Sequence, residues 1–91
     1  MPVEPPPVLY HGTVERFMDA IVREGLTKQS RQHVHLSPDR DTAVIVGRRR
    51  GKPIILRVDA AAVSGAGRAF FLSENGVWLT DAVPPEFLTQ D

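Results

Sequence analysis

The chain has 91 residues, 42% of them hydrophobic, which fits one small domain with a core and excludes a disordered chain. It contains no cysteine, which excludes disulfides, thiolate metal sites and a cysteine nucleophile. Eleven basic and eleven acidic residues give a formal net charge of zero, so a bulk attraction for nucleic acid is not indicated. With no bilayer-spanning apolar run and no secretory signal, we expect a soluble, cytoplasmic protein without a membrane partner.

Three consecutive prolines lie near the start of the chain. Because proline lacks an N–H group and favours extended backbone, residues 1–7 are predicted to form a lead-in or linker. Residues 8–91 are predicted to form a single domain. The apolar segment at residues 8–10 predicts a short strand that ends at His11-Gly12.

A helix is predicted to follow directly. Thr13 is a good N-cap, and Phe17 and Ile21 recur at helical spacing. Gly25 is the expected end of this helix. Residues 26–30 are then predicted to form a loop.

Residues 31–37 predict a short strand that organises the rest of the chain. Side chains alternate between the two faces of a strand. One face carries the polar residues Arg31, His33 and His35, and the other carries Gln32, Val34 and Leu36. The second face can pack on a core, whereas the first places a cation and two imidazoles in a row.

A second helix is predicted from Ser37-Pro38 to Gly51, because a hydroxyl cap followed by proline is a typical helix start. Its buried side is expected to be supplied by residues 43–46. Residues 54–59 then form an apolar run of β-formers, which predicts a strand in a central position.

The C-terminal third is predicted to be mainly β. Residues 60–67 are small, and no regular structure is assigned to them. Residues 69–72 and 77–79 predict two strands joined by a hairpin at Asn75-Gly76. Pro84-Pro85 is expected to end regular structure. The predicted order, β–α–β–α–β–β–β, favours an α+β fold with a small mixed or antiparallel sheet and two helices.

His11-Gly12-Thr13 lies where the first strand is predicted to give way to the first helix. Gly12 allows a ligand to approach the backbone, and a helix N-terminus offers N–H donors to an anion or a carboxamide. The alternative is that Gly12 only makes a tight turn.

Two further groups of residues have a functional and a structural interpretation. His11, His33 and His35 are the three histidines of the chain, and three imidazoles can bind zinc; the stronger alternative is that they are hydrogen-bonded within the fold, and no metal is assigned. The basic run Arg48–Arg50 with Lys52 can bind phosphate or simply stabilise a helix C-terminus as a solvated surface. Ser73–Gly76 fits a hairpin turn with no other role.

Taken together, the motifs resemble the tRNA 2′-phosphotransferase family over about residues 8–88. Each motif alone is weak, but the set comes in the family's order and at its spacing. The motifs are Tyr10-His11-Gly12-Thr13, Arg31-Gln32-His33-Val34-His35-Leu36-Ser37, Gly47-Arg48-Arg49-Arg50-Gly51-Lys52-Pro53, Ser73-Glu74-Asn75-Gly76-Val77-Trp78-Leu79-Thr80 and Val83-Pro84-Pro85-Glu86-Phe87-Leu88.

The resemblance implies an ADP-ribosyltransferase-like fold and a transferase that uses NAD⁺ in tRNA processing and splicing. The family transfers an internal RNA 2′-phosphate to NAD⁺. The phosphate attacks the ribose carbon that bears nicotinamide. The neighbouring ribose hydroxyl then attacks phosphorus, which releases RNA and ADP-ribose 1″,2″-cyclic phosphate.

Residue roles follow from the same resemblance. Arg31 and His11 are implied to be catalytic, with Arg31 engaging the reacting phosphate. Val77 stands where many ADP-ribosyltransferases place a catalytic glutamate. A phosphate dianion is already a nucleophile, so the site has to supply positioning and charge neutralisation rather than a general base. The implied NAD-binding residues are His11, Gly12, Thr13, Ser30, His33, His35 and Val77.

Family members also carry an N-terminal winged-helix-like lobe that helps to bind the RNA phosphate, and nothing in this sequence matches it. We therefore expect a fragment, a stand-alone lobe, or one of two polypeptides that act together. The alternatives to full phosphotransfer are a stand-alone ADP-ribosyltransferase that acts on another phosphate or nucleic-acid end, and a non-catalytic NAD- or nucleotide-binding module.

Overall fold

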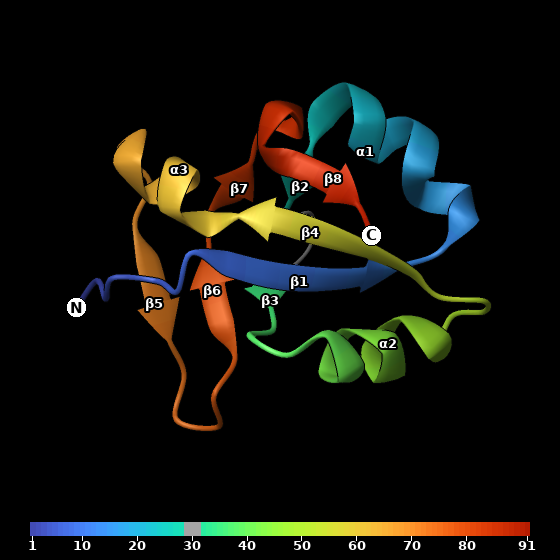
Figure 1. Ribbon diagram of the computed structural model, residues 1–91, viewed down its shortest axis with the longest axis horizontal. Helices are drawn as coiled ribbons and strands as arrows, with labels where there is room; N and C mark the ends of the chain where they lie inside the picture. Colours follow the sequence, from blue (N-terminus) through green and yellow to red (C-terminus); the bar gives the residue numbers. More distant parts are fainter. Residues whose placement is uncertain (29–31) are drawn as a thin grey trace.

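The computed structural model describes residues 1–28 and 32–91 as an α+β fold of three small sheets, in which all strand pairs are antiparallel. The first sheet has the order β1-β4-β8, the second β2-β7 and the third β3-β6-β5 (Figure 1). The strands are β1 (Val8–Thr13), β2 (Leu26–Thr27), β3 (Val34–Leu36), β4 (Ile54–Asp59), β5 (Phe70–Leu72), β6 (Trp78–Thr80), β7 (Ala82–Val83) and β8 (Leu88–Gln90).

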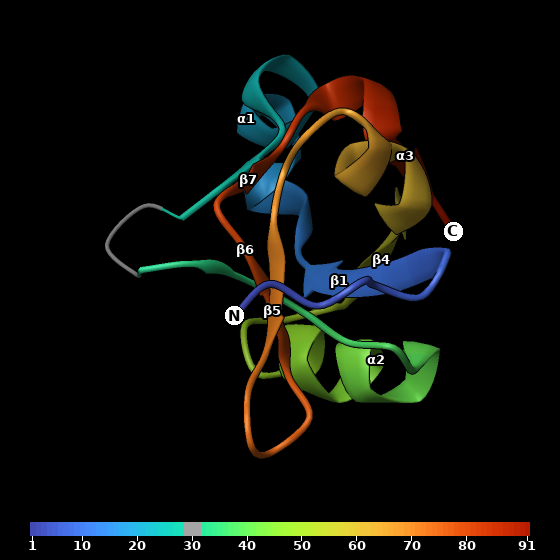
Figure 2. The same cartoon turned by 90° about the vertical axis from the view of Figure 1, so that its left-hand side faces the viewer.

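Three α-helices occur in the described part of the chain, together with two 3₁₀ turns. The helices are α1 (Met18–Glu24), α2 (Arg40–Arg48) and α3 (Ala60–Gly65), and the 3₁₀ turns are η1 (Glu15–Phe17) and η2 (Pro85–Phe87). Helix α2 lies on one side of β1, whereas α1 and α3 lie on the other side, as Figures 1 and 2 both show. None of the described helices combines the length and apolarity needed to cross a membrane.

The core lies between the sheets and is closed by α1 and α3. Its fully buried side chains come from α3 and from strands far apart in the sequence, where side chains alternate between the two faces. The largest of them are Phe70, Leu9, Leu36, Val58, Val63, Val83 and Thr80. Trp78, the one tryptophan of the chain, is 8% exposed and belongs to the same cluster.

Helix α2 packs directly on the backbone of β1 through two glycines. A methyl group added to Gly12 would lie 1.9 Å from the carbonyl oxygen of Ala43. A methyl group added to Gly47 would lie 3.2 Å from the backbone nitrogen of Thr13. Side chains on these two residues would therefore push the helix and the strand apart.

The first strand is longer than predicted, and the prediction that Thr13 caps a helix is wrong. β1 pairs with β4 from Val8 opposite Asp59 to Thr13 opposite Ile54. Thr13 is 2% exposed, and the chain then enters η1 without a side-chain cap. Pairing with a six-residue partner strand outweighs the local capping preference of threonine. The predicted end of α1 at Gly25 is confirmed, since Gly25 has φ of 77°.

Helix α2 begins later than predicted, and of the residues predicted to be buried only Ala43 is fully so. Its N-cap is Asp39, whose carboxylate accepts hydrogen bonds from the Asp41 N–H at 3.1 Å and the Thr42 hydroxyl at 3.0 Å. The buried positions are Ala43 and Gly47. The predicted burial of the whole 43–46 segment is wrong: Ile45 and Val46 are exposed, because the small residues alone face β1.

In the C-terminal third, one unassigned segment is helical and one prediction is wrong. Residues 60–65, to which no structure was assigned, form α3, and the Asp59 carboxylate caps it by accepting from the Ala62 N–H at 3.2 Å. Regular structure continues beyond Pro85 as η2 and β8, because β8 pairs with the edge of β4 that β1 leaves open. The predicted central position of residues 54–59 is confirmed, as is the hairpin between β5 and β6.

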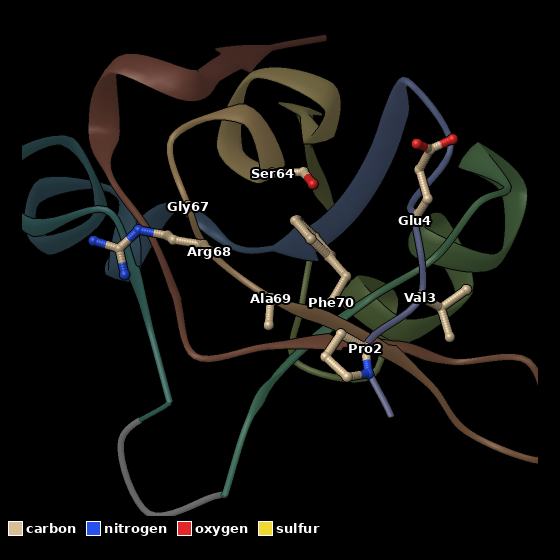
Figure 3. A pocket seen from close by; sticks show the side chains of 8 residues that line it. All are labelled: Pro2, Val3, Glu4, Ser64, Gly67, Arg68, Ala69 and Phe70. Atoms are coloured by element: carbon tan, nitrogen blue, oxygen red, sulfur yellow. The ribbon is translucent and has the colours of Figure 1, made fainter.

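The predicted lead-in lies against the domain. The Val3 N–H donates to the Phe70 carbonyl at 2.8 Å, and the Ala61 N–H donates to the Pro7 carbonyl at 3.2 Å. Pro5 is buried. A hollow of about 270 Å³ lies beside this segment (Figure 3), and its lining residues are Pro2, Val3, Glu4, Ser64, Gly67, Arg68, Ala69 and Phe70.

Candidate functional site

Strand β3 has the two-faced character that its sequence predicts. Val34 and Leu36 are 4% and 1% exposed and point into the core, whereas His35 between them is exposed. His33 is half-buried just before the strand. Two predicted site residues, Ser30 and Arg31, lie outside the described residues.

The motif around His11 and the motif around His35 meet in space. Tyr10 and Ser37 exchange two backbone hydrogen bonds, at 2.8 Å and 2.9 Å, which join β1 to the end of β3. His11 Nδ1 lies 3.1 Å from the carbonyl oxygen of His35. Because a carbonyl oxygen can only accept, Nδ1 carries the hydrogen in this contact. The fold thus brings together two segments that the sequence separates by 24 positions.

The backbone of Gly12 faces the same edge of β1. In a strand, residues two apart direct their N–H and C=O groups to the same side. Since Tyr10 directs these groups to Ser37, Gly12 directs its own toward β3. Within residues 1–28 and 32–91, no backbone hydrogen bond joins Gly12 to β3. Strands β1 and β3 therefore separate beyond the Tyr10–Ser37 pair. The N–H and C=O groups of Gly12 lie at the point of separation.

The outer face of the β3-β6-β5 sheet carries the remaining predicted residues. His35 is opposite Leu79 and Leu79 is opposite Phe71, so these three share one face. The ring of His33 lies 5.6 Å from the ring of Phe71, tilted by 57°. Val77 is on the same face by alternation, and its carbonyl oxygen accepts a hydrogen bond of 2.9 Å from the Ser73 N–H at the hairpin turn.

Phe71 and Leu79 were not singled out in the sequence as site residues. The signal that could have found them is the alternation of the two predicted strands, 69–72 and 77–79, which places every second residue on the face shared with the histidines.

The structure bears on the alternative interpretations of the histidines and of Gly12. No group of three His, Cys, Asp or Glu side chains suitable for a metal occurs in the described part of the chain, and the His11–His35 contact is a hydrogen bond within the fold. Gly12 makes neither a tight turn nor a helix start: it is a position of close packing on α2. The NAD-binding roles implied for Gly12 and Thr13 stay predictions.

A second hollow is lined by residues of α2, β4 and the C-terminal strand β8. It measures about 450 Å³ and has both acidic and basic walls. Its lining residues are Glu15, Arg40, Lys52, Pro53, Ile54, Ile55, Gln90 and Asp91.

Comparison with known proteins identifies the family. A family model described as "RNA 2′-phosphotransferase, Tpt1 / KptA family" matches residues 1–82. A probable RNA 2′-phosphotransferase of Streptomyces griseus is 64% identical over 87 residues, which are 96% of this chain and 46% of that protein. The same name is carried by relatives from Agrobacterium fabrum, 59% identical over 97% of the chain and 47% of the relative, and from Acaryochloris marina, 50% identical over 99% of the chain and 50% of the relative.

The chain spans about half the length of the curated relatives it matches. The match covers both motifs that the structure brings together, at Tyr10–Thr13 and at the strand before Ser37. The resemblance noted from the sequence is therefore confirmed, and the chain belongs to the RNA 2′-phosphotransferase, Tpt1 / KptA family.

Proposed function

We propose that this chain is the NAD-binding part of an NAD-dependent RNA 2′-phosphotransferase, with its pocket where β1 and β3 separate. The observation that carries the proposal is the contact of His11 with the His35 carbonyl next to the Tyr10–Ser37 pair. It places an oriented imidazole, the Gly12 peptide groups and the exposed His35 side by side. Family membership and this convergence support the same assignment.

The chemistry of these groups fits NAD⁺ as a substrate. A nicotinamide carboxamide carries one acceptor and one donor, which match the N–H and C=O of Gly12. The paired rings of His33 and Phe71 offer a surface for a flat heterocycle. When bound, NAD⁺ supplies an electrophilic ribose carbon with nicotinamide as the leaving group. The hydrogen bond of His11 to His35 holds the imidazole in one orientation beside it.

Arg31 is proposed to neutralise the reacting RNA 2′-phosphate. A phosphate dianion needs no general base, so a fixed cation and correct positioning account for most of the required stabilisation. Val77 is proposed to add an apolar wall on the face that carries Leu79, at the position where the resemblance implies a glutamate in many ADP-ribosyltransferases. The absence of a carboxylate at this position is consistent with a nucleophile that is already ionised.

Calorimetric titration with NAD⁺ and ADP-ribose tests the pocket. We expect saturable binding by the wild-type chain and at least about a tenfold loss of affinity in His11→Ala, which corresponds to about 1.4 kcal/mol for one hydrogen-bonding group. Arg23→Ala, on the exposed surface of α1, is the matched control and should bind as the wild type does.

The transfer step is followed separately with a 2′-phosphorylated oligonucleotide. Arg31→Ala should keep NAD⁺ binding and lose about 10²- to 10³-fold in cyclic phosphate formation, as expected for removal of one transition-state donor. If product forms from a terminal phosphate but not from an internal 2′-phosphate, the chain is instead an ADP-ribosyltransferase that acts on nucleic-acid ends. Tight NAD⁺ binding without any turnover would indicate a non-catalytic module, and an unfolded Arg31→Ala protein would make Arg31 structural.

A further inference from the structure

Five exposed cations lie where α2 ends beside η1, and we refer to them as the basic cluster. One ends the helix, three follow it in the chain, and one comes from η1. The basic cluster consists of Arg16, Arg48, Arg49, Arg50 and Lys52.

The backbone of the basic cluster is ordered by its own hydrogen bonds and contacts. The Arg50 N–H donates to Gly47 at 3.1 Å and the Gly51 N–H to Arg48 at 3.4 Å. The Arg16 and Arg50 guanidinium groups lie 4.9 Å and 5.9 Å from the centre of the Phe17 ring. Cation–π contacts with one ring therefore tie the two segments into one surface.

The basic cluster is not neutralised within the described part of the chain. The ion pairs there join Arg23 to Glu24, Lys28 to Asp81 and Arg40 to Asp91, and none includes a member of the cluster. Glu15 lines the same hollow as Lys52 and offsets one charge. A net charge of zero for the whole chain thus conceals a strongly positive surface. Like charges gathered in this way favour a polyanion as the partner.

The position of the basic cluster connects it to the proposed pocket. Gly47, which immediately precedes it, packs on the Thr13 end of β1, two residues beyond His11. NAD⁺ carries two phosphates, fewer than the five cations can engage, whereas an RNA strand offers a phosphate at every nucleotide. Exposed arginine guanidinium groups also suit the stacking of unpaired bases.

We propose that the basic cluster binds the RNA backbone next to the nucleotide that carries the 2′-phosphate. The inference rests on the proposed function, since it assigns a contact surface to the RNA substrate of that reaction. In this proposal, Arg48, Arg49 and Lys52 bind the phosphates of single-stranded RNA. Arg16 and Arg50 keep their cation–π contacts with the Phe17 ring.

Fluorescence anisotropy with a labelled single-stranded RNA, in the absence of NAD⁺, tests the inference. The variant Arg48→Gln/Arg49→Gln/Lys52→Gln removes three cations and leaves both guanidinium contacts with Phe17. Each lost phosphate contact lowers the slope of log K against log salt by about 0.7, so we expect the slope to fall by about 2 and the affinity at about 0.1 M salt to fall about 100-fold.

The control Arg23→Gln/Arg57→Gln/Arg68→Gln removes three exposed cations elsewhere and should keep wild-type RNA affinity. Thermal unfolding verifies that both triple variants fold. Equal losses in the two variants, no RNA binding by the wild type, or tighter binding of an acidic peptide would overturn the inference. If the cluster variant loses affinity for NAD⁺ and not for RNA, the inference is wrong and these cations bind the pyrophosphate of NAD⁺. Cluster-dependent RNA binding by a chain that does not bind NAD⁺ would overturn the proposed function alone.

Discussion

Gly12 stands at the closest approach of β1 to α2, where the carbonyl of Ala43 occupies the space that a side chain would need. Its packing role and its proposed ligand role use different parts of the residue. The absent side chain admits the helix on one face of the strand. The peptide groups point along the sheet plane toward β3, where the carboxamide is proposed to bind.

The substitution Gly12→Ala is expected to destabilise the domain by about 3 kcal/mol or more, because a contact of 1.9 Å with backbone has to be relieved by moving a whole helix. Gly47→Ala is the matched control: its contacts of 3.2 Å are milder, and alanine regains about 1 kcal/mol of helix propensity. Urea denaturation measures both free energies of unfolding. Equal stabilities of the two variants would contradict the packing described for α2.

Helix α2 shows how a local signal is displaced at the scale of an element. Ser37-Pro38 has the chemistry of a helix start, but Ser37 is engaged in the backbone pair with Tyr10. The helix starts only after this pair, and Asp39 becomes its cap. The end of β3 therefore decides where α2 begins.

Asp39→Ala should cost about 1 kcal/mol of stability, because the N–H of Asp41 and the hydroxyl of Thr42 lose their acceptor. Ser37→Ala keeps the backbone pair with Tyr10 and should cost less. The two free energies of unfolding are compared by chemical denaturation. A larger loss in Ser37→Ala would restore the start of the helix to the position that the sequence suggested.

Elements with strong local signals were predictable from the sequence. The apolar β-formers of β4, the turn at Asn75-Gly76 and the end of α1 at Gly25 agree with the structure. Elements that depend on distant partners were not. β8 forms because β4 offers an open edge, and β1 extends to Thr13 because β4 continues opposite it. Neither partner is visible in a local window of sequence.

In the candidate site, too, features set by local sequence were predictable and features set by distant partners were not. The alternation that exposes His35 and buries Val34 and Leu36 was predictable, since it needs only the period of a strand. The contact between His11 and the His35 carbonyl was not, because it depends on the pairing of Tyr10 with Ser37. From the sequence, only the family resemblance indicated that the segments around His11 and His35 lie close together.

At the scale of the whole molecule, the first seven residues contribute to the packed structure. Val3 and Pro7 make backbone hydrogen bonds with β5 and α3, and Pro5 is buried. The segment predicted as a lead-in therefore covers one end of the core. The domain boundary at residue 8, which was a prediction from composition, can be tested by its effect on stability.

Deletion of residues 2–6 should lower the free energy of unfolding by about 1–3 kcal/mol, because it removes the Val3–Phe70 hydrogen bond and the buried Pro5. Val3→Ala preserves the backbone bond and serves as the control. The midpoint of denaturation gives the difference. An unchanged midpoint in the deletion variant would show that these residues behave as a linker.

The burial of Trp78 gives this protein an intrinsic optical reporter. It is the one tryptophan in the sequence, and it sits in β6 directly opposite Leu36 of β3. Its indole faces the core, on the side of the sheet away from His35 and Leu79. Emission from this residue therefore follows the separation of β3 from β6 on unfolding, without an added label, while the face proposed to bind nucleotide stays free of any probe.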